Sequence, residues 1–290
     1  MIDPMVAALT RTTATGLPVQ PSLRKKLEQH LRELPVLPEV IVELMRLRPE
    51  APRFFEEVQR LVELEPAFST RLLAAANSAA SAPRQPILGA RAALQRIGSR
   101  SAAELLLATA VTNVFVPRDE WAKALWRHSL EVAVLARSLA AREGADPEHA
   151  YTCGLLHDVG RFILLSEAPE QLRAIEATPW TTPEALVAAE RSICGLTHAE
   201  LGAFACRKWR LPELVAQVVA DHHAPQRIRS SLARVVTVAD TLMFDSVRTD
   251  GHGPSQEPGG ATAPLSEEAA AAVQQARTEA AAMVEALGVA

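Results

Sequence analysis

The chain has 290 residues, of which 48% are hydrophobic and 22% charged, a composition that predicts a soluble globular protein with a packed core. Its net charge of −4 gives no electrostatic reason to expect nucleic acid or an anionic membrane as a partner. The longest apolar run, 101–116, contains Glu104 and Asn113 and is too short to cross a bilayer, so we expect no membrane partner.

Two features predict a cytoplasmic location. The three cysteines, Cys153, Cys194 and Cys206, lie far apart without the CxxC spacing of a zinc knuckle, which favours reduced and buried thiols. Residues 1–20 carry no basic segment followed by an apolar run, so no secretory signal is predicted there. Their Thr, Pro and Gly content without periodicity predicts a flexible leader.

Residues 21–117 are predicted to form a helical N-terminal lobe. In 21–34, one apolar stripe recurs at steps of four, four and three residues, which is typical of an amphipathic helix: Leu23, Leu27, Leu31 and Leu34. Further helices are expected in 34–47 and 53–66, and the next begins at Pro66, where the missing N–H costs nothing. Segment 89–115 predicts a helix, a turn at Gly98 and a second helix.

Residues 118–246 are predicted to form a second group of helices. The first covers 119–144, with Asp119 as its cap and Gly144 as its end. Others are expected at 148–166, 182–192, 198–209, 212–222 and 230–245. The β-branched residues of 233–240 would suit a strand, but no partner strand is predicted nearby, so we interpret them as helical. The predicted fold class is all-α.

The last part of the chain changes in composition. Residues 247–264 are dense in Gly and Pro and predict a linker. In the helix predicted at 265–290, apolar residues alternate at steps of three and four: Val273, Ala276, Ala280, Met283 and Leu287. Two heptads are too few to hold a coiled coil alone, so this helix is expected to dock on the body of the protein or to form a homodimer.

Five of the eight histidines and two aspartates stand out by their apolar, helical surroundings. They are His128, His157, Asp158, His198, His222, His223 and Asp240. Neutral imidazole and carboxylate are the usual ligands of zinc, manganese and iron(II) in proteins. The other histidines, His30, His149 and His252, are interpreted as ordinary core or surface residues.

The adjacent pair His157 and Asp158 limits the geometry of such a site. Neighbouring residues on a helix diverge by about 100°, so the two cannot chelate one ion from one helix face. Both can reach a cleft that lies between their directions, where Asp158 can bridge two ions roughly 3.5–4 Å apart. Structural roles remain open: His223 as a cation at a helix C-terminus, His128 as a packed side chain, and Asp240 as a solvated charge.

The order H…HD…H…HH…D resembles the signature of the HD superfamily of metal-dependent phosphohydrolases. The resemblance implies that one ion is held by His128, His157, Asp158 and Asp240. In members with a second ion, further ligands match His198, His222 and His223, and the HD aspartate bridges. The implied cofactor is a divalent transition metal, Fe, Mn, Zn or Ni, as one or two ions.

The blocks "LPVLPEVIVELMRL", "ELEPAFSTRLLAAANSAA", "PILGARAALQRIGSRSAAELLL" and "GLLHDVGRFILL" narrow the resemblance. They occur in the order found in HDOD domains, the HD-related output domains of bacterial signalling, over about residues 25–245. The resemblance implies an HD-like helical core at 118–246 that follows the N-terminal lobe.

Two departures separate this chain from the HD-GYP phosphodiesterases, which cleave cyclic di-GMP. Arg161 stands where those enzymes have a lysine, and "HHAPQR" lacks the GYP element. Arginine stays charged and can contact phosphate, but it is not a simple substitute for lysine. The candidate catalytic residues are therefore Asp158 and, in place of the lysine, Arg161.

Three functions compete. The favoured one is a bacterial signalling module that acts through contacts with other signalling proteins, with or without a bound metal. The second is an active metal-dependent phosphohydrolase acting on a nucleotide or cyclic dinucleotide. The third is a nucleic-acid binder, because residues 90–106, with Arg91, Arg96 and Arg100, imitate a helix-turn-helix. The acidic net charge disfavours nucleic acid as a partner.

Overall fold

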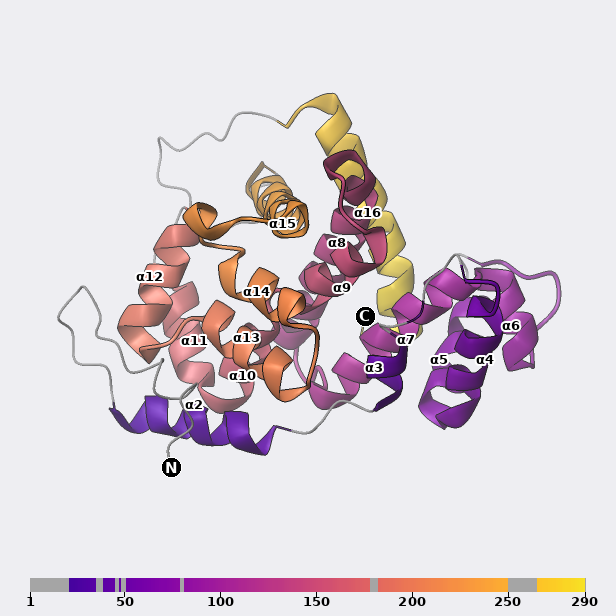
Figure 1. The fold of residues 1–290 in the computed structure, drawn as a ribbon, viewed down its shortest axis with the longest axis horizontal. Helices are drawn as coiled ribbons and strands as arrows, with labels where there is room; N and C mark the ends of the chain where they lie inside the picture. Colours follow the sequence, from indigo (N-terminus) through magenta and orange to yellow (C-terminus); the bar gives the residue numbers. More distant parts are fainter. Residues whose placement is uncertain are drawn as a thin grey trace.

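The computed structural model describes residues 21–34, 39–44, 47, 51–78, 81–177, 182–249 and 265–289, and all regular elements in these ranges are helices (Figure 1). The predicted all-α fold class is confirmed. None of the helices in the described ranges has the length and apolar character needed to cross a bilayer. The predicted leader at 1–20 and residues 250–264 of the predicted linker lie outside the described ranges.

Six helices are described between residues 21 and 114. They are α2 (Pro21–Glu33), α3 (Glu39–Leu44), α4 (Phe54–Leu64), α5 (Pro66–Ala76), α6 (Ala90–Ile97) and α7 (Ser99–Val114). Pro66 occupies the first turn of α5, as expected. Gly98 separates α6 from α7 with a φ of 87°, a backbone conformation that favours glycine.

The described residues after α7 form nine further α-helices. They are α8 (Glu120–Ala140), α9 (Pro147–Leu156), α10 (Val159–Glu167), α11 (Pro169–Glu176), α12 (Pro183–Cys194), α13 (His198–Lys208), α14 (Glu213–Asp221), α15 (Ser231–Thr249) and α16 (Glu267–Leu287). The Asp119 carboxylate caps α8 by accepting from the backbone N–H of Ala122 at 2.8 Å. The β-branched segment 233–240 is helical, within α15.

Several helices differ from the sequence prediction. The helix expected at 148–166 is two helices, α9 and α10, which meet at His157 and Asp158. Helix α11 was not predicted, and α15 continues to Thr249, three residues into the predicted linker. Just after the break, α10 packs closely on the start of α13, because a Cβ atom at Gly160 would lie 1.9 Å from the carbonyl oxygen of His198. The backbones of α10 and α13 therefore meet at Gly160 and His198.

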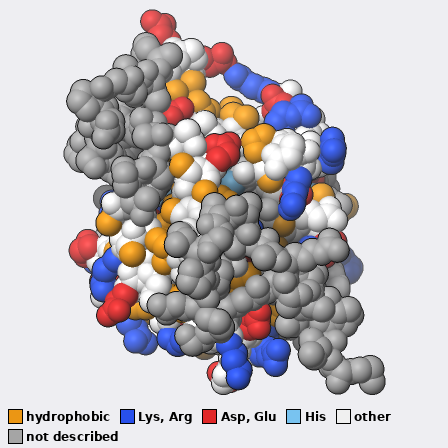
Figure 2. All heavy atoms as spheres, turned by 90° about the vertical axis from the view of Figure 1, so that its left-hand side faces the viewer, with side chains coloured by type: hydrophobic (Ala, Val, Ile, Leu, Met, Phe, Trp, Pro, Cys, Tyr) orange, Lys and Arg blue, Asp and Glu red, His pale blue; other side chains and the backbone are white. Residues whose placement is uncertain are grey.

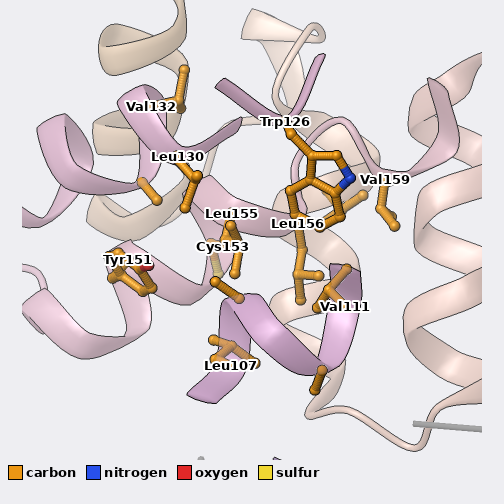
Figure 3. Close-up of a cluster of buried hydrophobic side chains, with 14 of the residues drawn as sticks. Leu107, Val111, Trp126, Leu130, Val132, Tyr151, Cys153, Leu155, Leu156 and Val159 are labelled. Carbon is orange, nitrogen blue, oxygen red and sulfur yellow. The ribbon is translucent and has the colours of Figure 1, made fainter. Parts of the chain in front are cut away.

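The centre of the molecule is the pair α8 and α9 (Figures 1 and 3). Gly154 allows the close approach of the two helices, because a Cβ there would lie 2.7 Å from Cα of Ala133. Trp126 of α8 is completely buried: its ring packs against Phe162 of α10, and its indole N–H donates to the carbonyl of Phe115 at 3.0 Å. Leu130 and the other side chains in Figure 3 complete this core. The core fixes the helices from which His128 and His157 project.

The first and the last described helices pack on this centre from different sides. Helix α2 contacts α10 and α13, so the first helix of the predicted N-terminal lobe lies against the second half of the chain, and the division at 117/118 stays a prediction. Helix α16 lies along α8 and also contacts α5 and α7. Its predicted seam faces the body: Val273, Ala276, Ala280 and Leu287 are buried, and Met283 is partly buried. The homodimer stays a prediction.

Candidate metal centre

All seven side chains predicted as metal ligands lie in one cluster where α8, the α9–α10 junction, α13, α14 and α15 meet. His128 comes from α8, His157 and Asp158 from the junction, His198 from the start of α13, His222 and His223 from the end of α14, and Asp240 from α15. Most of the cluster is buried. The His128 side chain keeps 26% of its surface exposed, so solvent reaches the cluster best on that side.

The first ion's predicted ligands lie close together. The Nε2 atom of His128 is 3.1 Å from Oδ1 of Asp240 and 3.8 Å from Oδ2 of Asp158. The Nε2 atom of His157 is 3.6 Å from the same two oxygens. Metal bonds of about 2.0–2.2 Å in a tetrahedron place ligand atoms roughly 3.4 Å apart. These four distances are compatible with the ligand spacing of one ion, and the ligand atoms of His128, His157 and Asp158 all lie within 4.8 Å of one another.

The second group gathers around the other oxygen of Asp158. Its Oδ1 atom lies 3.2 Å from Nε2 of His198 and 3.9 Å from Nε2 of His222. His223 offers a ligand atom within 4.8 Å of those of the other three side chains, and its Nδ1 is also 3.9 Å from Oδ2 of Asp240. Because Asp158 presents one oxygen to each group, it has the geometry of a bridging carboxylate.

Unsatisfied buried atoms support a cation in this cluster. The Nε2 atom of His157 and the Oδ1 atom of Asp158 are buried without a hydrogen-bond partner, which costs free energy unless a ligand satisfies them. The other nitrogen of His157 donates to the Gly154 carbonyl at 2.6 Å, and that of His222 to the Val219 carbonyl at 2.8 Å. Both rings therefore direct the Nε2 lone pair into the cluster, and the donors suit a divalent transition metal.

Glu190 is a member of the site that the sequence interpretation missed. Its carboxylate is completely buried, and both oxygens lie 2.7 Å from Nδ1 of His198. It also accepts a hydrogen bond from the backbone N–H of His198 at 2.9 Å. The sequence does contain a signal for Glu190, because this residue lies on the same face of α12 as the buried residues Leu186 and Cys194. A carboxylate on a buried helix face needs a partner.

Arg161 lies beside the cluster, but two carboxylates hold it. Its Nη1 atom is 3.4 Å from Oδ2 of Asp158, and its Nη2 atom donates to Glu176 of α11. The side chain is only 12% exposed. Because α11 was not predicted, Glu176 was not predicted as a partner either. The structure thus places the candidate catalytic arginine in an ion pair.

The pKa values of the histidines and aspartates favour the binding of a cation in the cluster. Burial and the neighbouring positive charges lower the pKa of His222 well below its usual value, and burial lowers that of His223 to about 4. Burial also disfavours charge on His157, but Asp158 and Asp240 outweigh it and raise its pKa to about 9. Burial opposes ionisation of both aspartates, yet the surrounding histidines hold their pKa values well below the usual range. In the absence of a metal ion, protons on histidine balance these two negative charges.

An all-helical fold with a buried His/Asp cluster of this order defines an HD-related protein. Residues 34–225 match the HDOD domain, and the chain belongs to the HDOD family. It is 27% identical over 244 residues to an uncharacterized protein of Treponema pallidum (strain Nichols), a match that covers 81% of this chain and 46% of that protein. It is 28% identical over 125 residues to ribonuclease Y of Lachnoclostridium phytofermentans, covering 43% of this chain and 19% of the ribonuclease. The chain thus spans less than half the length of these relatives.

Solved structures share the fold. An HDOD domain protein of unknown function from Geobacter sulfurreducens superposes with a TM-score of 0.67 at 22% identity, covering 91% of this chain and 92% of that one. A Marinobacter aquaeolei VT8 protein, whose name proposes a role in signal transduction, gives 0.69 at 20% identity, covering 98% and 64%. A Shewanella amazonensis SB2B protein, whose name proposes a phosphohydrolase, gives 0.62 at 23%, covering 91% and 97%. At these identities the likeness shows the fold alone.

Proposed function

We propose that this chain is a regulatory module of bacterial signalling that acts through contacts with other signalling proteins. In this proposal the His/Asp cluster holds one or two divalent transition-metal ions, Fe, Mn, Zn or Ni. The observation that carries it is the pairing of Arg161 with Glu176 and Asp158 beside an otherwise complete ligand set. Membership of the HDOD family and the signalling name of the Marinobacter neighbour support it.

The state of Arg161 argues against efficient hydrolysis. Phosphoryl-transfer sites depend on cations that are placed to stabilise the charge of the reacting group. Here the guanidinium closest to Asp158 must first leave Glu176, which costs free energy because the pair is largely buried. Without a positioned cation for the substrate, much of the rate acceleration available from orientation is lost.

The residues around the cluster are suited to holding a metal rigidly. A bound divalent ion supplies Lewis-acid chemistry and acidifies bound water. The chain's own contribution is orientation: the Gly154 carbonyl fixes the ring of His157, and Glu190 fixes that of His198. Such a site contributes to the folding free energy when metal is bound, so a regulatory module can use it for stability.

The second candidate is a phosphohydrolase acting on a nucleotide or cyclic dinucleotide. The two faces of Asp158, one for each group of histidines, favour it, because two-metal hydrolytic sites share a bridging carboxylate. Relatives named ribonuclease Y and the Shewanella neighbour with a phosphohydrolase name point the same way.

A nucleic-acid partner gains no support. All three arginines of 90–106 are engaged within the chain: Arg91 with Gln59, Arg96 with Ser81, and Arg100 with Glu148 at 2.8 Å. On the face shown in Figure 2, basic and acidic side chains of the described residues are interspersed.

A turnover assay distinguishes the regulatory module from the phosphohydrolase. Protein loaded with manganese, iron or nickel is incubated with cyclic di-GMP, common nucleotides and a short RNA, and product is measured by chromatography. We expect little or no turnover. The Glu176→Gln variant, which removes one of the two carboxylates paired with Arg161, is the more sensitive test, and its turnover is expected to exceed that of the wild type. Robust turnover by the wild type that disappears in Asp158→Ala would replace the module by the hydrolase.

A further inference from the structure

A cavity outside the metal centre lies between α2, the connection from α7 to α8, α10 and α11. Its volume is about 470 Å³, within the range of sites that bind small molecules. None of the seven predicted metal ligands lines it. The cavity therefore calls for a ligand of its own.

The inner wall of the cavity is apolar. Leu34 after α2, Phe115 between α7 and α8, and Phe162 of α10 line it and are buried. The rings of Phe115 and Phe162 stack with their centroids 5.7 Å apart, and the buried ring of Trp126 packs on Phe162 with a centroid distance of 4.7 Å. The core thus holds this wall in place, and these side chains suit the apolar part of a ligand.

The exposed edge of the cavity carries two arginines, Arg118 and Arg173. The guanidinium of Arg173 lies 5.8 Å from the centre of the Trp121 ring, in the first turn of α8, and Arg118 comes three residues before Trp121. Both arginines therefore line the edge beside the start of α8. Within the part of the chain that the structure describes, neither forms an ion pair with a carboxylate.

The carboxylates of the cavity, in contrast, have partners within the chain. Oδ1 of Asp119 accepts from the backbone N–H of Ala122 as the cap of α8. Oε1 of Glu167 lies 2.9 Å from Nδ1 of His30, and its other carboxylate oxygen lies 3.7 Å from Nζ of Lys26. Because Lys26 balances Glu167 and the N-terminus of α8 stabilises Asp119, the two guanidinium groups are left without a balancing anion.

We propose that this cavity binds a small apolar monocarboxylate. Its apolar body lies along Leu34 and Phe162, and its carboxylate lies at the exposed edge, where it pairs with Arg118 and Arg173. At this edge the charged group keeps part of its hydration, so binding removes mainly apolar surface from water. The site is independent of the metal centre and goes beyond the function proposed above.

The test is calorimetric titration of the full chain with hexanoate, octanoate, decanoate and 3-phenylpropanoate. We expect at least one of them to bind with a saturable isotherm. Its neutral amide and its amine should each bind at least tenfold more weakly, because neither can form the charged pairs with the arginines. Failure of all these carboxylates to bind, or equal binding of the amide, would overturn the proposal.

Matched variants locate the binding. Val116 lines the cavity and Leu64 of α4 does not, and both residues are 58% exposed. Val116→Glu adds a negative charge to the cavity and should weaken the best carboxylate at least tenfold, whereas Leu64→Glu should change its affinity less than twofold. Arg173→Gln should also weaken it at least tenfold, and Arg127→Gln, at an exposed position of α8 outside the cavity, less than twofold.

Binding of the carboxylate to the metal centre is the alternative outcome. It would be lost in a folded Asp158→Ala variant, whereas binding in the cavity should stay within twofold of the wild type, because Asp158 does not line the cavity. Circular dichroism and melting temperature establish that each variant is folded at the temperature of the titration. Equal affinity of Val116→Glu and Leu64→Glu, or loss of binding in Asp158→Ala, would refute the assignment.

Discussion

In three of the histidines, a hydrogen bond at one ring nitrogen orients the other ring nitrogen toward the centre of the cluster. His157 and His222 donate to backbone carbonyls of their own helices, whereas His198 depends on the side chain of Glu190. Carboxylates in this position fix the ring and increase the basicity of the coordinating nitrogen. Glu190 is thus the one orienting group of the three that a substitution can remove.

Replacing Glu190 with Gln should weaken metal binding roughly 10–100-fold, because the ring of His198 loses its charged acceptor. Competition with a chromophoric chelator measures the affinity. The control is Glu184→Gln, an exposed position on the same helix, and it should bind metal like the wild type. Unchanged affinity in Glu190→Gln would show that the ring is held by other contacts.

Gly160 allows Asp158 and His198 to meet. A Cβ atom at this position would lie 1.9 Å from the His198 carbonyl oxygen, so Gly160→Ala must separate α10 from α13. We expect the free energy of unfolding, from urea titration, to fall by about 3 kcal/mol. Gly89→Ala is the matched control, since a Cβ there meets nothing within 4 Å, and it should cost about 1 kcal/mol or less. Similar losses in both variants would contradict the close approach.

Sequence reasoning located the residues whose types carry their own chemistry, and their role as metal ligands stays a prediction. The seven candidate ligands were found by their order and by resemblance, and they converge. Glu190 and Glu176 were missed because glutamate is usually a surface residue, and their partners come from other helices. The tie between Arg161 and Glu176 requires knowledge of where α11 packs.

At the level of elements, the break between α9 and α10 places the His–Asp pair. An uninterrupted helix over 148–166 would diverge the two side chains by about 100°. The turn at His157 and Asp158 instead lets one carboxylate face both groups of histidines. The break was not predictable from periodicity, because 150–165 is almost continuously apolar and a buried helix and a buried junction give the same pattern.

Helix α16 was predicted from its seam, and its docking can be tested there. Ala280 is completely buried, so Ala280→Glu places a charge in the interface and should lower the free energy of unfolding by about 2 kcal/mol or more. The neighbouring Ala281→Glu is exposed and should change it by no more than about 0.5 kcal/mol. Urea titration compares the two, and equal stability would mean that α16 contributes little to the fold.

The junction of α7, α8 and α16 should make stability depend on pH. The pKa of Glu104 is raised from 4.5 to about 7 in the folded protein by burial, so between these values the folded state keeps a proton that the unfolded chain releases. Its contribution to the free energy of unfolding therefore falls as pH rises across this window, by up to roughly 3 kcal/mol. Urea titrations from pH 4.5 to 7.5 should show a flatter profile for Glu104→Gln. Parallel profiles would refute this role.

For the whole molecule, the fold brings the metal centre together from distant parts of the chain. His128 and Asp240 are 112 residues apart in sequence, and their ligand atoms are 3.1 Å apart. Contacts between residues so far apart in sequence cannot be predicted from local patterns, and only the family resemblance predicted this one. Helix α2 packs against α10 and helix α16 against α8, so loss of metal is expected to destabilise the packing of both outer helices.

The central claim is that the cluster holds metal, and counting metal tests it most directly. Freshly purified protein is freed of unbound ions, and iron, manganese, zinc and nickel are quantified by inductively coupled plasma mass spectrometry. The account predicts one to two equivalents per chain in the wild type and their loss in a folded Asp158→Ala variant, because Asp158 faces both groups of ligands. A wild type without metal after incubation with these ions, or an Asp158→Ala variant that retains as much, would contradict it.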